Sequence, residues 1–161
     1  MKPLVFTILS FWFLCCSTDK EKMLADESDS ASILNFEAKI TDVSFSGEPN
    51  AYTLSTTISS PDTGCDQYAD WWEILDLEGN LIYRRILTHS HVEEQPFTRS
   101  GSKITLASST EVYIRVHMNT TGYSSAVQKG TIETGFSAAE LSATFANDLE
   151  NQQPLPTGCA F

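Results

Sequence analysis

Apolar and polar residues alternate along most of the chain from residue 34 onward, and this two-residue period is typical of half-buried β-strands. The pattern is clearest over 111–118, where the apolar positions run from Val112 to Met118. The side chains expected to face outward there are Tyr113, Arg115 and His117. The same period predicts strands over 34–45, 52–58, 68–77, 81–87, 104–106 and 126–132. About seven short strands separated by turns favour an all-β fold, and an immunoglobulin- or fibronectin-III-like β-sandwich is the leading interpretation.

Two parts of this pattern need separate treatment. Trp71 and Trp72 must face opposite sides of the strand 68–77, and the sequence does not decide which of them enters the core. From residue 137 the period changes to that of a helix with Ser137 at its N-cap, which predicts a short C-terminal helix within 137–151. Its apolar face would comprise Ala138, Leu141, Phe145 and Leu149.

The first 16 residues have the composition of an export signal. A positively charged start precedes the apolar run 3–14, which is too short to span a membrane as a helix. Cys15 and Cys16 follow, and this arrangement resembles a bacterial lipoprotein signal, in which cleavage exposes a cysteine that carries lipid. Cys16 fits this role better than Cys15, because it places a small residue rather than Leu14 before the cleavage point. Phe13 departs from the leucine usual in the family, and an ordinary secretory signal or an uncleaved anchor is the alternative.

The resemblance implies a domain organisation and a location. Residues 1–16 would comprise the signal peptide and anchor cysteine, residues 17–32 a flexible tether, and residues 33–161 the β-sandwich domain. A cysteine bearing palmitate would hold the protein on a membrane, and Ser17 after it resembles the sorting residue of outer-membrane lipoproteins. We therefore expect a lipoprotein of the cell envelope, on the periplasmic or the surface face of the outer membrane.

The charge balance restricts the partners. The chain has 21 acidic and 10 basic residues and a formal net charge of −11. Such a chain repels phosphate backbones, so nucleic acid is not an expected partner. It also repels anionic lipid surfaces, so membrane attachment would depend on the lipid anchor.

Two cysteines lie outside the leader, and both follow a Thr-Gly pair. An even number of cysteines in an exported chain favours a disulfide, here between Cys65 and Cys159. The bridge would tie the C-terminal tail to the loop before the strand 68–77. The alternative is a metal-binding or redox pair, although neither cysteine belongs to a C-x-x-C motif.

The three histidines of the chain give the sharpest chemical hypothesis. His89 and His91 form an H-x-H pair, which on extended chain places both imidazoles on one face about 7 Å apart. His117 lies at the end of another predicted strand and would supply a third ligand for copper or zinc. The alternative, which is favoured, is a pair of histidines at a loop that bond to nearby carboxylates, with no cofactor.

The segment after this pair offers a second candidate. Residues 96–102 are expected to form a loop, in which Phe97 and Arg99 would build an aromatic and guanidinium rim for a carboxylate or a glycan. The favoured alternative places Phe97 in one end of the sandwich and pairs Arg99 with an acid such as Asp70. Of the neighbouring Arg84 and Arg85, which point to opposite faces, one is expected to pair with a carboxylate.

No catalytic motif accompanies these residues: the sequence lacks G-x-S-x-G, H-E-x-x-H and a phosphate-binding glycine loop. The central run YADWWEILDLEGNLIYRRILTHSHVEEQPFTRSG is similar to domains of uncharacterised exported bacterial proteins, a resemblance that implies no activity. The sequence therefore predicts a lipid-anchored, non-catalytic binding or structural module, with an envelope protein or a glycan as its ligand. The alternative is a copper- or zinc-binding envelope protein.

Overall fold

The structure, a computed structural model, describes residues 37–160 of the chain. The predicted signal peptide, Cys16 and the whole predicted tether, residues 17–32, therefore lie outside the described residues. Within the described part, no helix is long and apolar enough to cross a membrane.

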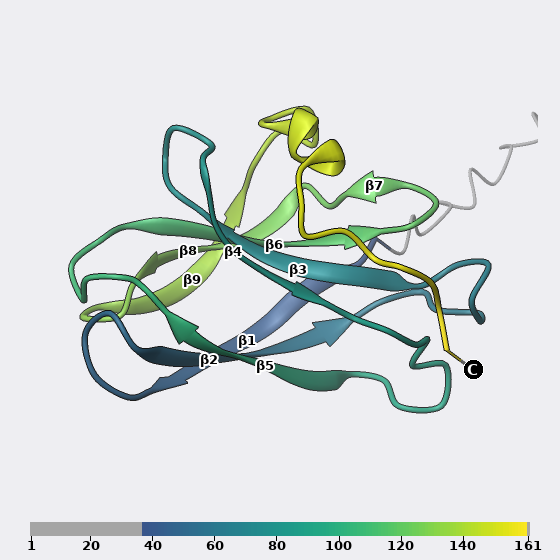
Figure 1. Cartoon of the computed structure of the whole chain (residues 1–161), viewed down its shortest axis with the longest axis horizontal. Helices are drawn as coiled ribbons and strands as arrows, with labels where there is room; N and C mark the ends of the chain where they lie inside the picture. Colours follow the sequence, from purple (N-terminus) through teal and green to yellow (C-terminus); the bar gives the residue numbers. More distant parts are fainter. Residues whose placement is uncertain (1–36, 161) are drawn as a thin grey trace, which may run out of the picture. The chain divides into compact units, whose positions relative to one another are not determined.

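Two antiparallel sheets face each other, as Figure 1 shows, and the predicted β-sandwich is confirmed. The smaller sheet has the strand order β1-β2-β5, and the larger has the order β4-β3-β6-β8-β9, with β7 paired to β6. The elements are β1 (Lys39–Ser46), β2 (Tyr52–Ser59), β3 (Ala69–Leu75), β4 (Leu81–Ile86), β5 (Phe97–Ile104), β6 (Val112–Met118), β7 (Gly122–Tyr123), β8 (Ala126–Thr131), β9 (Gly135–Glu140) and the 3-10 helix η1 (Asn147–Asn151). The immunoglobulin or fibronectin-III type stays a prediction.

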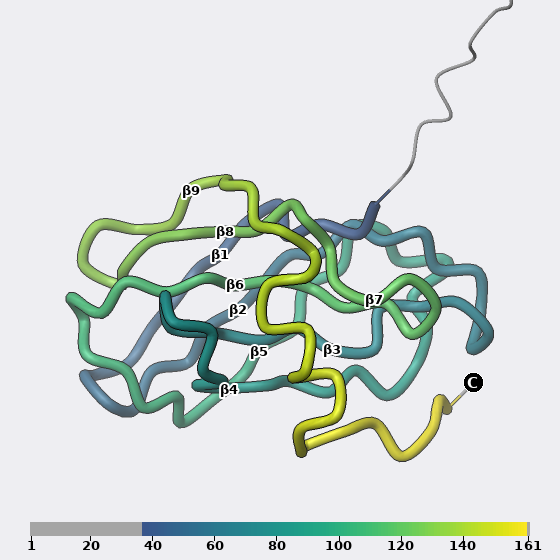
Figure 2. The backbone as a smooth tube through the Cα atoms, turned by 90° about the horizontal axis from the view of Figure 1, so that it is seen from above, coloured from purple at the N-terminus to yellow at the C-terminus, as the bar shows by residue number. Residues whose placement is uncertain are grey.

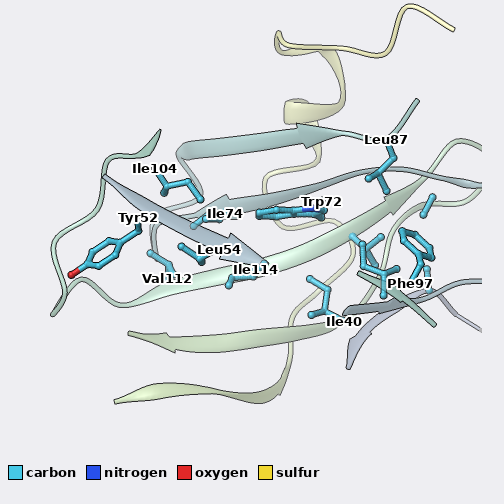
Figure 3. Packing of buried hydrophobic residues seen from close by; sticks show 14 of the residues in the cluster. Ile40, Tyr52, Leu54, Trp72, Ile74, Leu87, Phe97, Ile104, Val112 and Ile114 are labelled. Atoms are coloured by element: carbon cyan, nitrogen blue, oxygen red, sulfur yellow. The ribbon is translucent and has the colours of Figure 1, made fainter. Parts of the chain in front are cut away.

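The core lies between the sheets and follows the alternation read from the sequence. In β6 the side chains predicted to face inward are buried, and in β2 Tyr52, Leu54, Thr56 and Ile58 enter the core. Trp72, fully buried, is the tryptophan that enters it, and it packs near Ile74 and Ile114 (Figure 3). Trp71 consequently lies on the outer face of the larger sheet.

That outer face is covered by residues 141–160, which we call the C-terminal segment. Figure 2 shows it crossing the strands of the larger sheet after β9. A second apolar cluster forms beneath it from Trp71, Leu75, Tyr123 and Leu149. Every residue of β3 is therefore buried, because this strand has the core on one face and the C-terminal segment on the other.

The disulfide between Cys65 and Cys159 is confirmed, with the two Cα atoms 5.6 Å apart. It fastens the end of the C-terminal segment to the loop before β3. Next to it, the amide of Ala160 donates a hydrogen bond to the carbonyl of Thr88. The segment is thus fixed at both ends, by β9 and by the bridge.

Two predictions about secondary structure are wrong. The helix expected from Ser137 is a strand over its first residues, because β9 pairs with β8 along its whole length as the edge strand of the larger sheet, with Ala138 opposite Gln128. Only η1 is helical in the C-terminal segment. The loop expected over 96–102 is mostly β5, in which Thr98 and Ser100 pair with Thr57 and Ser55 of β2. The prediction failed because β5 carries small polar side chains on its solvated face, and such residues are also typical of loops.

Candidate functional site

A row of three charged residues crosses the outer face of the larger sheet. Glu73 of β3 lies directly opposite Arg84 of β4 on one side and Arg115 of β6 on the other. Its two oxygens accept hydrogen bonds from Arg84 Nε at 2.7 Å and Arg115 Nε at 2.8 Å. All three side chains are buried, so their charges compensate one another away from solvent. The sequence predicted that one arginine of the Arg84–Arg85 pair would meet a carboxylate, and Arg84 is the one.

The remaining guanidinium groups hold the C-terminal segment. Arg84 donates to the carbonyls of Leu149, Gln152 and Pro154, and Arg115 donates to those of Phe145 and Ala146. These carbonyls have no strand partner, so the two arginines supply the donors that a sheet would otherwise provide. The row is therefore a structural clamp, and its cations are fully engaged.

Beside this clamp lies an imidazole held by a carboxylate. His117 of β6 is opposite Trp71 of β3, and their rings stack with centroids 3.7 Å apart. Nδ1 of His117 donates to Oδ1 of Asp70 at 2.6 Å. Arg84 covers the Trp71 ring at 4.5 Å, so the indole is enclosed by cation and imidazole. The imidazole is held in position by this bond, and in its neutral form the bond to the carboxylate places the hydrogen on Nδ1 and the lone pair on Nε2.

The free side of this imidazole faces a polar hollow of about 490 Å³ between β6, β7 and η1. We call it the His117 hollow; its lining residues are Trp71, His117, Asn119, Thr120, Thr121, Gly122, Glu150 and Asn151. Glu150 places its Oε1 3.9 Å from Nε2 of His117, beyond hydrogen-bond distance. The indole Nε1–H of Trp71 is buried and has no acceptor among the described residues. Nε2 of His117 and the indole N–H of Trp71 therefore have no hydrogen-bond partner within residues 37–160.

Burial changes the acidity of the groups around the hollow. It raises the pKa of the Asp70 carboxyl, and the hydrogen bond from His117 opposes this shift. It also raises the pKa of the Tyr123 hydroxyl, with Glu73 adding to the effect, so this tyrosine stays neutral. Tyr123 lies against the Arg115 guanidinium, whose carbon is 3.3 Å from its ring centroid.

The H-x-H pair lies elsewhere, in the loop between β4 and β5. His91 is buried, and its ring stacks on Phe97 with centroids 3.7 Å apart and lies 4.5 Å from the His89 ring. Its amide donates to Asp62, but neither ring nitrogen has a hydrogen-bond partner among the described residues. Burial lowers the pKa of His91 to about 4, and the nearby Arg99 adds to the shift. Residues 89–94 and Ala160 line a second hollow of about 500 Å³.

The structure does not bring the three histidines together. His117 contacts Asp70 and Trp71 on the outer sheet face, whereas His91 packs against Phe97 at the edge of the core. Within residues 37–160, no three His, Cys, Asp or Glu side chains are grouped so that they could hold a metal ion. The expected three-histidine arrangement fails because the β4–β5 loop and β6 present their histidines to different surroundings.

The expected binding rim is also wrong for Phe97. Its side chain is 1% exposed and belongs to the main core, as the alternative interpretation required. Arg99 pairs with Glu94 at 2.9 Å and not with Asp70, which is engaged by His117. Arg99 is partly exposed, but the aromatic ring beside it, that of Phe97 at 5.4 Å, is buried.

Sequence reasoning singled out His117 and Asp70 separately, but it missed that they pair, and it missed Glu150. The outward alternation of β6 pointed to His117 and Arg115, but Asp70 is 47 residues away and Glu150 lies where a longer helix was expected. The outward face of β6 carries a tyrosine, an arginine and a histidine, which is also an ordinary composition for a solvated face, so the sequence did not show that this face is covered.

Comparisons with known proteins give one informative relative. A protein of Halomicrobium mukohataei named "Putative lipoprotein" is 35% identical over 116 residues, which are 71% of this chain and 57% of that protein. The chain thus spans little more than half the length of this relative. No protein-family model matches the chain, and no solved structure matches it. The chain is therefore similar to a protein named as a lipoprotein, in agreement with the character of its leader.

Proposed function

We propose that this protein is a lipid-anchored β-sandwich of the cell envelope that binds a ligand without transforming it. The observation that carries the binding role is the His117 hollow, where a buried, oriented imidazole faces a polar space with its Nε2 unpartnered. An apolar or fully satisfied outer face would serve stability equally well. An Nε2 beside an open polar hollow, with no hydrogen-bond partner among the described residues, favours a ligand that pairs with it.

Binding is favoured over catalysis by the surroundings of His117. An Asp–His pair needs a nucleophile within hydrogen-bond reach to activate it. Among residues 37–160, no serine, threonine or cysteine side chain forms a hydrogen bond with His117. The two cysteines described are joined to each other and offer no thiol. A solution screen follows from this: the protein should bind fragments of envelope polymers and leave them uncleaved over hours.

The lipid anchor is proposed at Cys16, with the domain on the outer membrane. It is supported by the apolar run 3–14 followed by two cysteines, and by the relative named as a lipoprotein. Growth of expressing cells with labelled palmitate tests it. We expect label in the unmodified chain and in Cys15→Ala, which keeps a small residue before the cleavage point, and none in Cys16→Ala. Label that survives Cys16→Ala would contradict the anchor assignment.

A further inference from the structure

We infer that the His117 hollow binds a primary ammonium group. The inference rests on the binding role proposed above, but not on the lipid anchor. It starts from two groups that lie 3.9 Å apart at the hollow and that are both acceptors when the imidazole is neutral: Nε2 of His117 and the carboxylate of Glu150.

The gap between these acceptors fits a nitrogen donor. They are 3.9 Å apart, so neither can satisfy the other while the imidazole is neutral. A nitrogen about 2.8 Å from each would donate one hydrogen to each atom, at an angle of roughly 90° at the nitrogen. An ammonium group has a third hydrogen to donate. The exposed side chains of Thr121 and Asn151 at the rim have no hydrogen-bond partner among the described residues and offer oxygen acceptors for it.

Charge favours a cation over a neutral or anionic ligand. Arg84 and Arg115, the nearest cations, are fully engaged by Glu73 and by carbonyls of the C-terminal segment. The hollow itself is lined by one carboxylate, that of Glu150, and by no arginine or lysine. The net charge of −11 adds a field that attracts cations. The Glu150 carboxylate would repel a phosphate or carboxylate ligand.

The test is a nuclear magnetic resonance titration of the full chain in detergent with glucosamine and with glucose, which differ in a single ammonium for hydroxyl exchange. The reporter is the indole N–H of Trp71, which lines the hollow, and that of Trp72 in the main core is the internal control. We expect glucosamine to shift the Trp71 signal and glucose to bind at least about tenfold more weakly, as expected for loss of a charge-assisted hydrogen bond. Equal binding of glucose and glucosamine, or no shift with glucosamine, ethanolamine or Nα-acetyl-lysine amide, would overturn the inference.

Variants of η1 provide the matched comparison. Glu150→Gln removes the proposed anionic acceptor with almost no change in shape, and it should weaken glucosamine binding about tenfold. Asp148→Asn removes the same charge from the same short helix at an exposed residue outside the hollow, and its affinity should stay within about twofold. Equal weakening by both variants would show a general charge effect and overturn the site.

A third arm identifies the source of the group and separates the two proposals. Ethanolamine and Nα-acetyl-lysine amide share the ammonium group with glucosamine. Tightest binding of ethanolamine would indicate a lipid headgroup, of the lysine derivative a protein, and of glucosamine an amino sugar. If neutral envelope fragments shift Trp71 but no amine does, the ammonium inference fails and the binding role stands. If nothing shifts Trp71, both fail.

Discussion

Removal of the Glu73 carboxylate should destabilise the fold more than any other single charge change. Its side chain is fully buried between Arg84 and Arg115, with hydrogen bonds of 2.7 and 2.8 Å. Glu73→Gln keeps the shape of the side chain, but it places an amide N–H donor against a guanidinium, which can donate hydrogen bonds but cannot accept them. Two buried cations are left without a counter-charge.

Breaking a buried ion pair by removing one partner costs about 3–5 kcal/mol. A domain of this size has about 5–15 kcal/mol of stability in total, so the variant should lose a large part of it. We expect the melting temperature to fall by roughly 10–20 °C, at about 3–5 °C per kcal/mol. Urea unfolding followed by tryptophan fluorescence measures the free energy directly, because Trp71 lies against Arg84.

Glu78→Gln is the matched control, since Glu78 is exposed in the turn between β3 and β4. It should change stability by less than about 0.5 kcal/mol. If Glu73→Gln lowers the free energy of unfolding by less than about 1 kcal/mol, Glu73 does not hold a buried structural clamp, because exposed ion pairs contribute that little. The double variant Glu73→Gln/Arg84→Met should lose less than the sum of its single variants, because each removes the same interaction.

Three other perturbations have defined outcomes. Cys65→Ser/Cys159→Ser should lower the unfolding free energy by up to about 4–5 kcal/mol, since the bridge closes a long loop; a change below about 0.5 kcal/mol in urea unfolding would contradict the fixed C-terminal segment. The pKa of His91 lies near 4 in the folded chain and at 6.5 ordinarily, so the free energy of unfolding should be constant above pH 6.5 and fall from pH 6.5 towards pH 4, by at most about 1.4 kcal/mol per pH unit. His91→Leu should flatten the accompanying fall in melting temperature. An unchanged slope in this variant would exclude His91 as the cause. Gly101→Ala should destabilise the domain by about 1–3 kcal/mol, because its Cβ would lie 2.4 Å from Tyr83 Cε1; calorimetry showing no loss would mean that the Tyr83 ring moves freely.

The sequence predicted the parts of the fold that depend on local alternation. The inward face of β6 was predicted correctly, because apolar side chains there have a polar neighbour on each side. The two tryptophans could not be placed, because both phases of β3 carry apolar residues. That ambiguity has a physical cause: the C-terminal segment covers the second face of β3, and local sequence does not show what a distant segment covers.

The errors at the site have a similar origin. The H-x-H spacing is compatible with a metal site on a regular strand, but the loop turns His91 inward. There Asp62 accepts a hydrogen bond from the His91 backbone amide, and Phe97 stacks on the His91 ring. The pairing of His117 with Asp70 follows from the register of β6 against β3, and register is set by the whole sheet. The sequence identified these histidines as candidates, but it did not show which side chains would lie beside them in the fold.

The state of the His117 ring tests the central claim most directly. Long-range proton–nitrogen spectra of the full chain at about pH 7, where glucosamine keeps its ammonium group, distinguish the two ring nitrogens. We predict hydrogen on Nδ1, a free lone pair on Nε2, and a shift of the Nε2 signal when glucosamine is added but not when glucose is added. Hydrogen on Nε2 in the free protein, or an Nε2 signal that glucosamine leaves unchanged, would contradict the account.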